Sequence, residues 1–311
     1  MSKHDATSRI ERPFSVIHIP SKGKYYEGCK SSFLVRHLSC IEESVLANGG
    51  LMETEDGIKL VLDSLIMDDF NIEDLLPGDV QAISMYLYST AYGDKIDMDV
   101  TCPHCSHQEK KEVFISQFSI KEMELLPDEN GLMQGVLPVS KRRFSIKIPT
   151  FFEEFRFKSA SDNNESHLER MAFLLHELNG EKDKEMIWGA LSSLSIMDSR
   201  FLKKFIEKNT PGVDTHILHN CGECHNEYKM HVSGGHNFLR LPESYAGSML
   251  EEVYLVVRHG EGIGWDSAMR MSTSQRKWLL TRIQQDVKKK NEQESRGAKS
   301  APSRSRSFKK R

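Results

Sequence analysis

Two Cys-x-x-Cys pairs, separated by 115 residues, constrain the fold of this 311-residue chain more than any other feature. Each pair places two thiols on one tight turn, Cys102 with Cys105 and Cys221 with Cys224. Four thiolates form the tetrahedral ligand set that zinc prefers, with sulfur at about 2.3 Å from the metal. A closed shell of four sulfurs leaves no position for a catalytic water, so we predict one structural zinc ion per chain.

A simple zinc ribbon has only roughly 15 to 20 residues between its pairs, far fewer than the 115 here, so the prediction of a shared site rests on the sequence around each pair. Alternating strand-like segments, Ile96–Val100 and Glu112–Ile115, flank the first pair, and Tyr228–Val232 follows the second. The alternative is two unrelated pairs of buried or free thiols. A thioredoxin-like redox pair would lie at a helix N-terminus in a βαβ unit, and neither pair has that context.

Other candidate ligands lie beside the knuckles. His104, His107 and His225 could each replace a cysteine, but with four thiols available we expect them to be exposed knuckle residues. Cys29 and Cys40 have no partner at a ligand spacing, and we interpret them as ordinary reduced thiols.

Composition and charge narrow the class of protein. Six cysteines are too few for a disulfide-stapled secreted scaffold, and no stretch approaches the roughly 18 to 20 apolar residues that span a bilayer. We therefore expect a soluble intracellular protein without a membrane partner. The formal charge of −3 hides a basic C-terminus, because residues 288–311 contain ten Lys or Arg and two Glu.

The hydrophobic pattern predicts an α+β fold in which short strands flank the two knuckles. We divide the chain into a disordered N-terminus (1–13), a strand and turn with three helices (14–94), a zinc-knuckle module with a helical insert at about 163–210 (95–242), a helical C-terminal region (243–290) and a disordered basic tail (291–311).

Two capping boxes mark helix starts. Ser39 with Glu42, and Ser272 with Gln275, have the spacing at which a serine side chain and a Glu or Gln side chain satisfy reciprocal backbone amides. Gly49-Gly50 is predicted to end the first of these helices.

Two aspartates are predicted to cap further helices. Asp79 would cap a helix that closes at Tyr92-Gly93, and Asp198 would cap the helix over Phe201–Ile206. Apolar residues at spacings of three and four predict that Leu168–Leu178 is helical throughout.

No catalytic motif stands out. The sequence lacks a phosphate-binding loop, a nucleophile elbow and a His-Glu-x-x-His helix. The glycine-rich segment His259–Gly264 does not follow an apolar strand, which favours a plain turn. We therefore expect neither an enzyme nor a small-molecule substrate.

The order of landmarks resembles the baseplate hub assembly proteins of T-even-type contractile-tailed phages. The resemblance covers roughly residues 14 to 280 and rests on Ile19-Pro-Ser-Lys-Gly-Lys-Tyr-Tyr26, the helix from Asp79 to Gly93, Thr101–Cys105 and Asn220–Cys224. It implies a late viral protein that acts as an assembly chaperone by contacting hub and tail proteins, without enzymatic activity. It also implies a location in the host cytoplasm during virion assembly, or in the tail baseplate of the virion.

A zinc-ribbon nucleic-acid-binding protein is the alternative. The basic tail could neutralise phosphates, but Phe308 is the only aromatic ring from Lys288 onward, so base stacking has little support. A solubilising or partner-docking tail is equally compatible with the sequence.

Four aromatic residues could contact partners. Tyr25 and Tyr26 follow a turn and suit an interface anchor, although packing against the first helix is the preferred interpretation. For Trp265 and Trp278, which flank the start of the last helix, we expect core packing.

Overall fold

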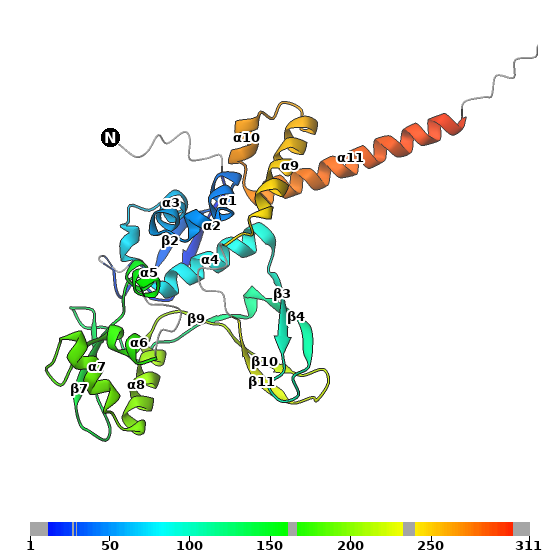
Figure 1. Ribbon diagram of the computed structural model, residues 1–311. Coiled ribbons are helices and arrows are strands. Elements are labelled where there is room, and N and C mark those ends of the chain that lie inside the picture. The colour runs from blue at the N-terminus through cyan, green and yellow to red at the C-terminus, as the bar shows by residue number, and fades with distance from the viewer. Residues whose placement is uncertain (1–11, 27, 29, 161–166, 233–239, 301–311) are drawn as a thin grey trace, which may run out of the picture.

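The protein is described by a computed structural model, which covers residues 12–26, 28, 30–160, 167–232 and 240–300. The predicted fold class is confirmed: the chain is mixed α+β, with short antiparallel sheets of two or three strands and a helical C-terminus (Figure 1). Most of the predicted disordered N-terminus and the last eleven residues of the tail lie outside the described residues, as does Cys29. Arg12 is described, and it forms an ion pair with Glu42 at 2.7 Å.

The first region is a hairpin followed by helices. Strands β1 (Phe14–His18) and β2 (Ser32–Arg36) pair antiparallel. The helices are α1 (Cys40–Leu46), α2 (Gly49–Met52), α3 (Glu55–Leu65), the 3-10 helix η3 (Ile72–Asp74) and α4 (Pro77–Tyr92).

The start of α1 is as predicted and its end is not. The capping box of Ser39 and Glu42 is confirmed, since both reciprocal hydrogen bonds are present. Gly49-Gly50 does not end this helix but begins α2, because the side chain of Asn48 accepts a hydrogen bond from the Leu51 amide and caps the new turn.

The prediction that Asp79 caps α4 is wrong. The helix begins two residues earlier, with Leu76 at the cap position and Pro77 in the first turn. Asp79 is buried, and its carboxylate accepts hydrogen bonds from the Ser21 amide at 2.9 Å and from the Tyr26 hydroxyl at 2.5 Å. Tyr26 is therefore a core residue, but its hydrogen bonds are to the start of α4 and not to the first helix, against which we expected it to pack.

Residues 132–209, which contain most of the predicted helical insert (about 163–210), form a lobe around a three-stranded sheet. Its strands are β6 (Leu132–Val136), β7 (Arg143–Lys147) and β8 (Leu175–Leu178), and its helices are α5 (Phe151–Ala160), α6 (His167–Leu174), α7 (Lys184–Ser192) and α8 (Ile196–Asn209). Buried residues of this lobe and of the first region form one hydrophobic cluster. The division into domains stays a prediction, but the insert packs with the first region.

Two details of the insert differ from the predictions. The helix predicted over Leu168–Leu178 ends at Leu174, because the Lys184 ammonium donates to the carbonyls at its end and β8 then pairs with β7. Helix α8 begins at Ile196 and is capped by Ser195, so Asp198 is not its cap.

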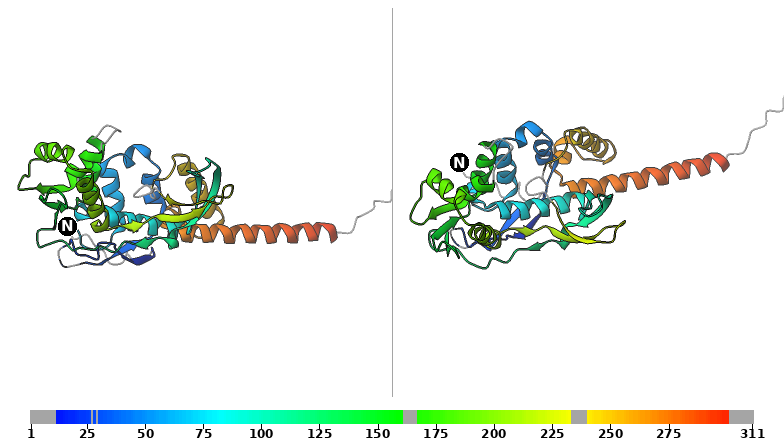
Figure 2. Two further views of the ribbon diagram at one scale, coloured as in Figure 1. Left: turned by 90° about the horizontal axis from the view of Figure 1, so that it is seen from below. Right: turned by 60° about the horizontal axis from the view of Figure 1, so that its bottom comes forward.

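The two knuckles are hairpins that lie side by side (Figures 1 and 2). The first consists of β3 (Lys95–Thr101) and β4 (Gln108–Phe114), and the second of β10 (His216–Asn220) and β11 (Glu227–His231). A 3-10 turn, η4 (Ile115–Gln117), and a short pair, β5 (Ser119–Ile120) with β9 (Val213–Asp214), connect them to the body. They share a small hydrophobic cluster with α4.

The C-terminal region consists of α9 (Ser244–His259), α10 (Trp265–Arg270) and α11 (Thr273–Ser300). Helix α11 projects far beyond the body (Figures 1 and 2). It enters the segment from residue 291 that we expected to be disordered, because Lys, Glu, Gln and Arg are good helix formers that need no core. Among the described residues, no helix is both long enough and apolar enough to cross a bilayer.

The prediction of core packing for the two tryptophans is wrong. Trp265 is 47 % exposed and Trp278 is 70 % exposed. The inner face of this region is occupied instead by Met249, Val253 and Val256 of α9.

Candidate metal centre

The same turn is built twice, once in each knuckle hairpin. In the first, the Cys102 amide donates to the His107 carbonyl and the Ser106 amide donates to the Cys102 carbonyl, both at 2.9 Å. In the second, the Cys221 amide donates to Asn226 and the His225 amide donates to Cys221, both at 3.1 Å.

Both turns place a residue in the left-handed region that non-glycine residues rarely adopt. Ser106 has a φ of 61° and His225 a φ of 55°. This conformation follows directly after the second cysteine of each pair. It closes the turn so that both thiols of the pair face the other hairpin.

The two hairpins bring the four thiols together. The sulfur of Cys102 lies 3.7 Å from that of Cys224, and the sulfur of Cys105 lies 3.6 Å from that of Cys221. All four sulfurs lie within 4.8 Å of one another. A tetrahedron of sulfurs at 2.3 Å from a central metal has edges of about 3.8 Å, so the cluster fits a metal site of four cysteines.

The environment lowers the pKa of the Cys102 and Cys221 thiols. At Cys105 the His107 amide acts in the same direction, but burial and the neighbouring thiols raise the pKa to about 12. Cys102 and Cys221 are buried, whereas Cys105 is exposed. Burial acts to raise the pKa of the Cys102 thiol, but the backbone amides of Cys105 and His104 outweigh it and lower that pKa to about 7. A metal binds the thiolate, so these amides also favour metal binding.

Histidines are not part of the cluster. In the part of the chain that the structure describes, the group of ligand atoms contains the four cysteines and neither His104, His107 nor His225. The ring of His104 packs instead 6.4 Å from that of Tyr228.

Sequence reasoning missed a polar contact that joins the hairpins beside the sulfurs. Nε2 of the buried His219 lies 2.9 Å from Oε1 of Glu109, and the Gly222 amide donates to the same carboxylate at 3.3 Å. The hydrogen bond from His219, together with that from Gly222, lowers the pKa of Glu109. Neither residue has a spacing to the cysteines that marks it in the sequence.

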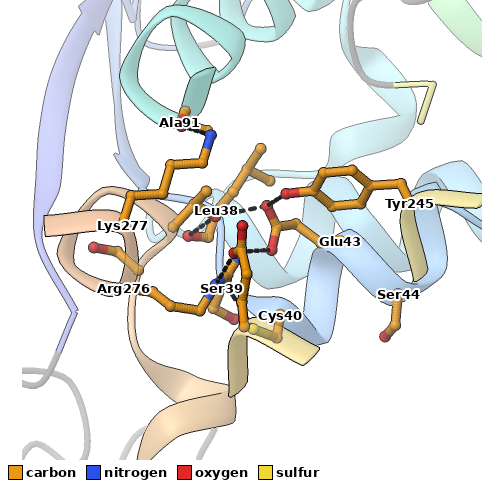
Figure 3. Close-up of polar contacts among 12 residues, drawn as sticks. Leu38, Ser39, Cys40, Glu43, Ser44, Ala91, Tyr245, Arg276 and Lys277 are labelled. Atoms are coloured by element: carbon orange, nitrogen blue, oxygen red, sulfur yellow. Dashed lines mark hydrogen bonds and ion pairs between the residues drawn. The ribbon is translucent and has the colours of Figure 1, made fainter. Parts of the chain in front are cut away.

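A second junction between distant segments was also missed. Glu43 of α1 and Arg276 of α11 are fully buried and form an ion pair at 2.7 Å (Figure 3). The other carboxylate oxygen of Glu43 accepts hydrogen bonds from the hydroxyls of Tyr92, Tyr245 and Thr273 at 2.8 to 2.9 Å.

The guanidinium of Arg276 also has hydrogen-bond partners besides Glu43. Its Nε donates to Glu252 at 2.8 Å and its Nη1 donates to the sulfur of Cys40 at 2.6 Å. Burial raises the pKa of Cys40 to about 12, so it is an inert thiol there.

The sequence predicted the two helix starts at this junction but not the ion pair. The second capping box is present, since Ser272 and Gln275 exchange hydrogen bonds, and Ser272 pairs as an antiparallel bridge with Ser39. The two predicted helix starts therefore meet, and Glu43 and Arg276 each lie four residues after one of these serines.

Comparison with protein-family models places the knuckles in a known family. A family model described as T4 bacteriophage base plate protein matches residues 36–240, which is more than half of the chain and includes both knuckles. The matched segment is narrower than the predicted resemblance and leaves out Ile19–Tyr26. No curated protein and no solved structure matches the chain at a significant level.

Proposed function

The chain belongs to the T4 bacteriophage base plate protein family, and on that premise we propose that it assists assembly of the base plate hub through protein–protein contacts. The observation that carries the proposal is the family match, and the resemblance of the knuckles and of Ile19–Tyr26 to hub assembly proteins supports the finer role. The partners would be hub and tail proteins of the phage. The site of action would be the host cytoplasm during virion assembly, or the base plate itself.

One structural zinc ion per chain would be held by Cys102, Cys105, Cys221 and Cys224. Tetrahedral sulfur is the ligand set that favours zinc among the common divalent metals. Four protein ligands leave no open position for water or substrate, so the ion would contribute folding energy and not catalysis. This is consistent with a structural role of the chain in the base plate.

The alternative of a nucleic-acid-binding ribbon receives little support from the knuckles. The hairpin over residues 95–114 carries three lysines and four carboxylates, and that over 216–231 carries one lysine and two glutamates. Binding to phosphates needs an excess of positive charge on the docking face. Neither hairpin has such an excess, whereas residues 288–311 do.

Elemental analysis and co-purification test the two parts separately. We expect about one zinc per chain in the wild type and none in Cys221→Ser. We expect hub proteins to co-purify from infected cells with the tagged wild-type chain. Two metals per chain would contradict the shared site, and recovery of nucleic acid without any base plate protein would contradict the assembly role.

A further inference from the structure

An exposed apolar patch lies where the turn between β6 and β7 meets α8. Val139 is 56 % exposed, Met197 is 62 % exposed and Phe201 is 39 % exposed. We call these residues and the cations around them, Lys141, Arg200 and Lys204, the turn–helix patch. It lies on the lobe opposite the projecting end of α11 (Figure 1).

The patch is held in place by Asp198. Its buried carboxylate accepts hydrogen bonds from the Val139 amide at 2.8 Å and from the Ser140 amide at 3.0 Å. The turn and the helix therefore form one surface. Met197, Phe201 and Lys204 share a face of α8, because residues separated by four and seven positions lie one above another.

The charge of the patch is unbalanced. Lys141, Arg200 and Lys204 are exposed, and none of them forms an ion pair with a described residue. The carboxylates of α8 do not cancel this charge, because Asp198 accepts two backbone hydrogen bonds and Glu207 forms an ion pair with Lys203. The patch thus offers apolar contact at its centre and uncompensated cations at its rim, which is the usual arrangement of a protein interface.

We propose that the turn–helix patch docks an acidic protein segment that carries an apolar side chain between its carboxylates. The apolar centre would bury that side chain, and Lys141, Arg200 and Lys204 would bind the carboxylates. A second copy of this chain on the same patch would face like charges. A nucleic acid would place phosphates against the apolar centre.

Charge reversal tests the surface, and the proposed function supplies the probes. Base plate hub proteins of the same phage would be purified and immobilised one at a time, and binding of the full chain would be measured. Arg200→Glu with Lys204→Glu reverses both cations that α8 contributes to the patch, and thermal unfolding of the variant checks that it still folds. The control reverses two exposed lysines elsewhere, Lys229→Glu with Lys289→Glu.

We expect the Arg200/Lys204 variant to weaken binding of one hub protein by about tenfold or more and to reduce its salt dependence, with the control unchanged. Met197→Ser, which removes an exposed apolar side chain, should also weaken binding of that hub protein. A photo-cross-linker at position 139 should react with an acidic segment of the same hub protein.

Hub binding that all these variants leave intact would overturn the docking surface and leave the assembly role standing. If no hub protein bound the wild type, both proposals would be wrong. Binding of a 30-nucleotide single strand, or a dimer of this chain, that the Arg200/Lys204 variant abolishes would assign the patch to another partner and overturn the inference.

Discussion

The thiol cluster and the Glu43–Arg276 junction both tie together segments that are far apart in sequence, but they do so by opposite means. The sulfurs join residues 116 and 122 positions apart, near the surface, beside a small hydrophobic cluster. The ion pair joins residues 233 positions apart, and both side chains are fully buried.

The difference lies in what each junction does for stability. The knuckle hairpins bury few apolar side chains of their own, so a bound metal would supply much of their folding free energy. The ion pair is fully buried, and its desolvation cost offsets most of its attraction. Its full set of hydrogen bonds instead fixes how α11 sits on α1.

The largest effect should come from Cys221→Ser. Structural zinc contributes about 10–16 kcal/mol of apparent binding free energy in small zinc domains, which exceeds what these hairpins could replace by packing. We expect hydrogen exchange to show lost protection over residues 95–114 and 213–232 together, while the core of the first region stays protected. Lys110→Gln, which changes an exposed side chain of β4 outside the turn, serves as the control. Opening of residues 213–232 alone would show that the knuckles do not share a metal.

A smaller loss of stability should follow the substitution Glu43→Gln. The change leaves the Arg276 guanidinium buried with one carboxylate fewer, at a cost of about 3 kcal/mol in the free energy of unfolding. The value lies at the low end for broken buried pairs, because Glu252 still accepts from Nε. Denaturant unfolding of this variant, beside Glu251→Gln on the exposed face of α9, measures it. Equal stability of the two variants would contradict a structural role for the pair.

Removing both charges should cost less than removing one. Glu43→Gln with Arg276→Met leaves no buried cation, so we expect it to be at least about 1 kcal/mol more stable than Glu43→Gln alone. The same unfolding experiment decides this. A double variant that is less stable than the single one would mean that the ion pair contributes net stability, as we propose for the metal.

The smallest change in stability should follow removal of the projecting end of α11. Ending the chain after Gln293 removes seven of the ten C-terminal Lys and Arg residues. The described side chains before this point, from Gln284 on, are exposed, so the free energy of unfolding should change by less than about 0.5 kcal/mol. On the assembly proposal, hub binding also survives. A truncated protein that unfolds normally but no longer binds hub proteins would show that the interface lies in the tail.

Features that depend on a few neighbouring residues were readable from the sequence. The Cys-x-x-Cys turns, the alternating strands beside them and both capping boxes are set by contacts within about four positions, because thiol spacing, strand period and serine caps are local properties. The α+β class and the pairing of the four cysteines followed from these signals.

Only the tertiary structure decided where the polar and aromatic side chains would go. Asp79 and Asp198 are of a residue type that often caps helices. In the structure they instead accept hydrogen bonds from the amides of Ser21 and Val139, which belong to distant segments. Trp278 was predicted to pack in the core, but in the structure α11 packs on α9 through other residues and Trp278 is exposed. A buried polar group is stable only where it finds hydrogen-bond partners, and the chain topology brings these from tens to hundreds of residues away, where no local spacing marks them.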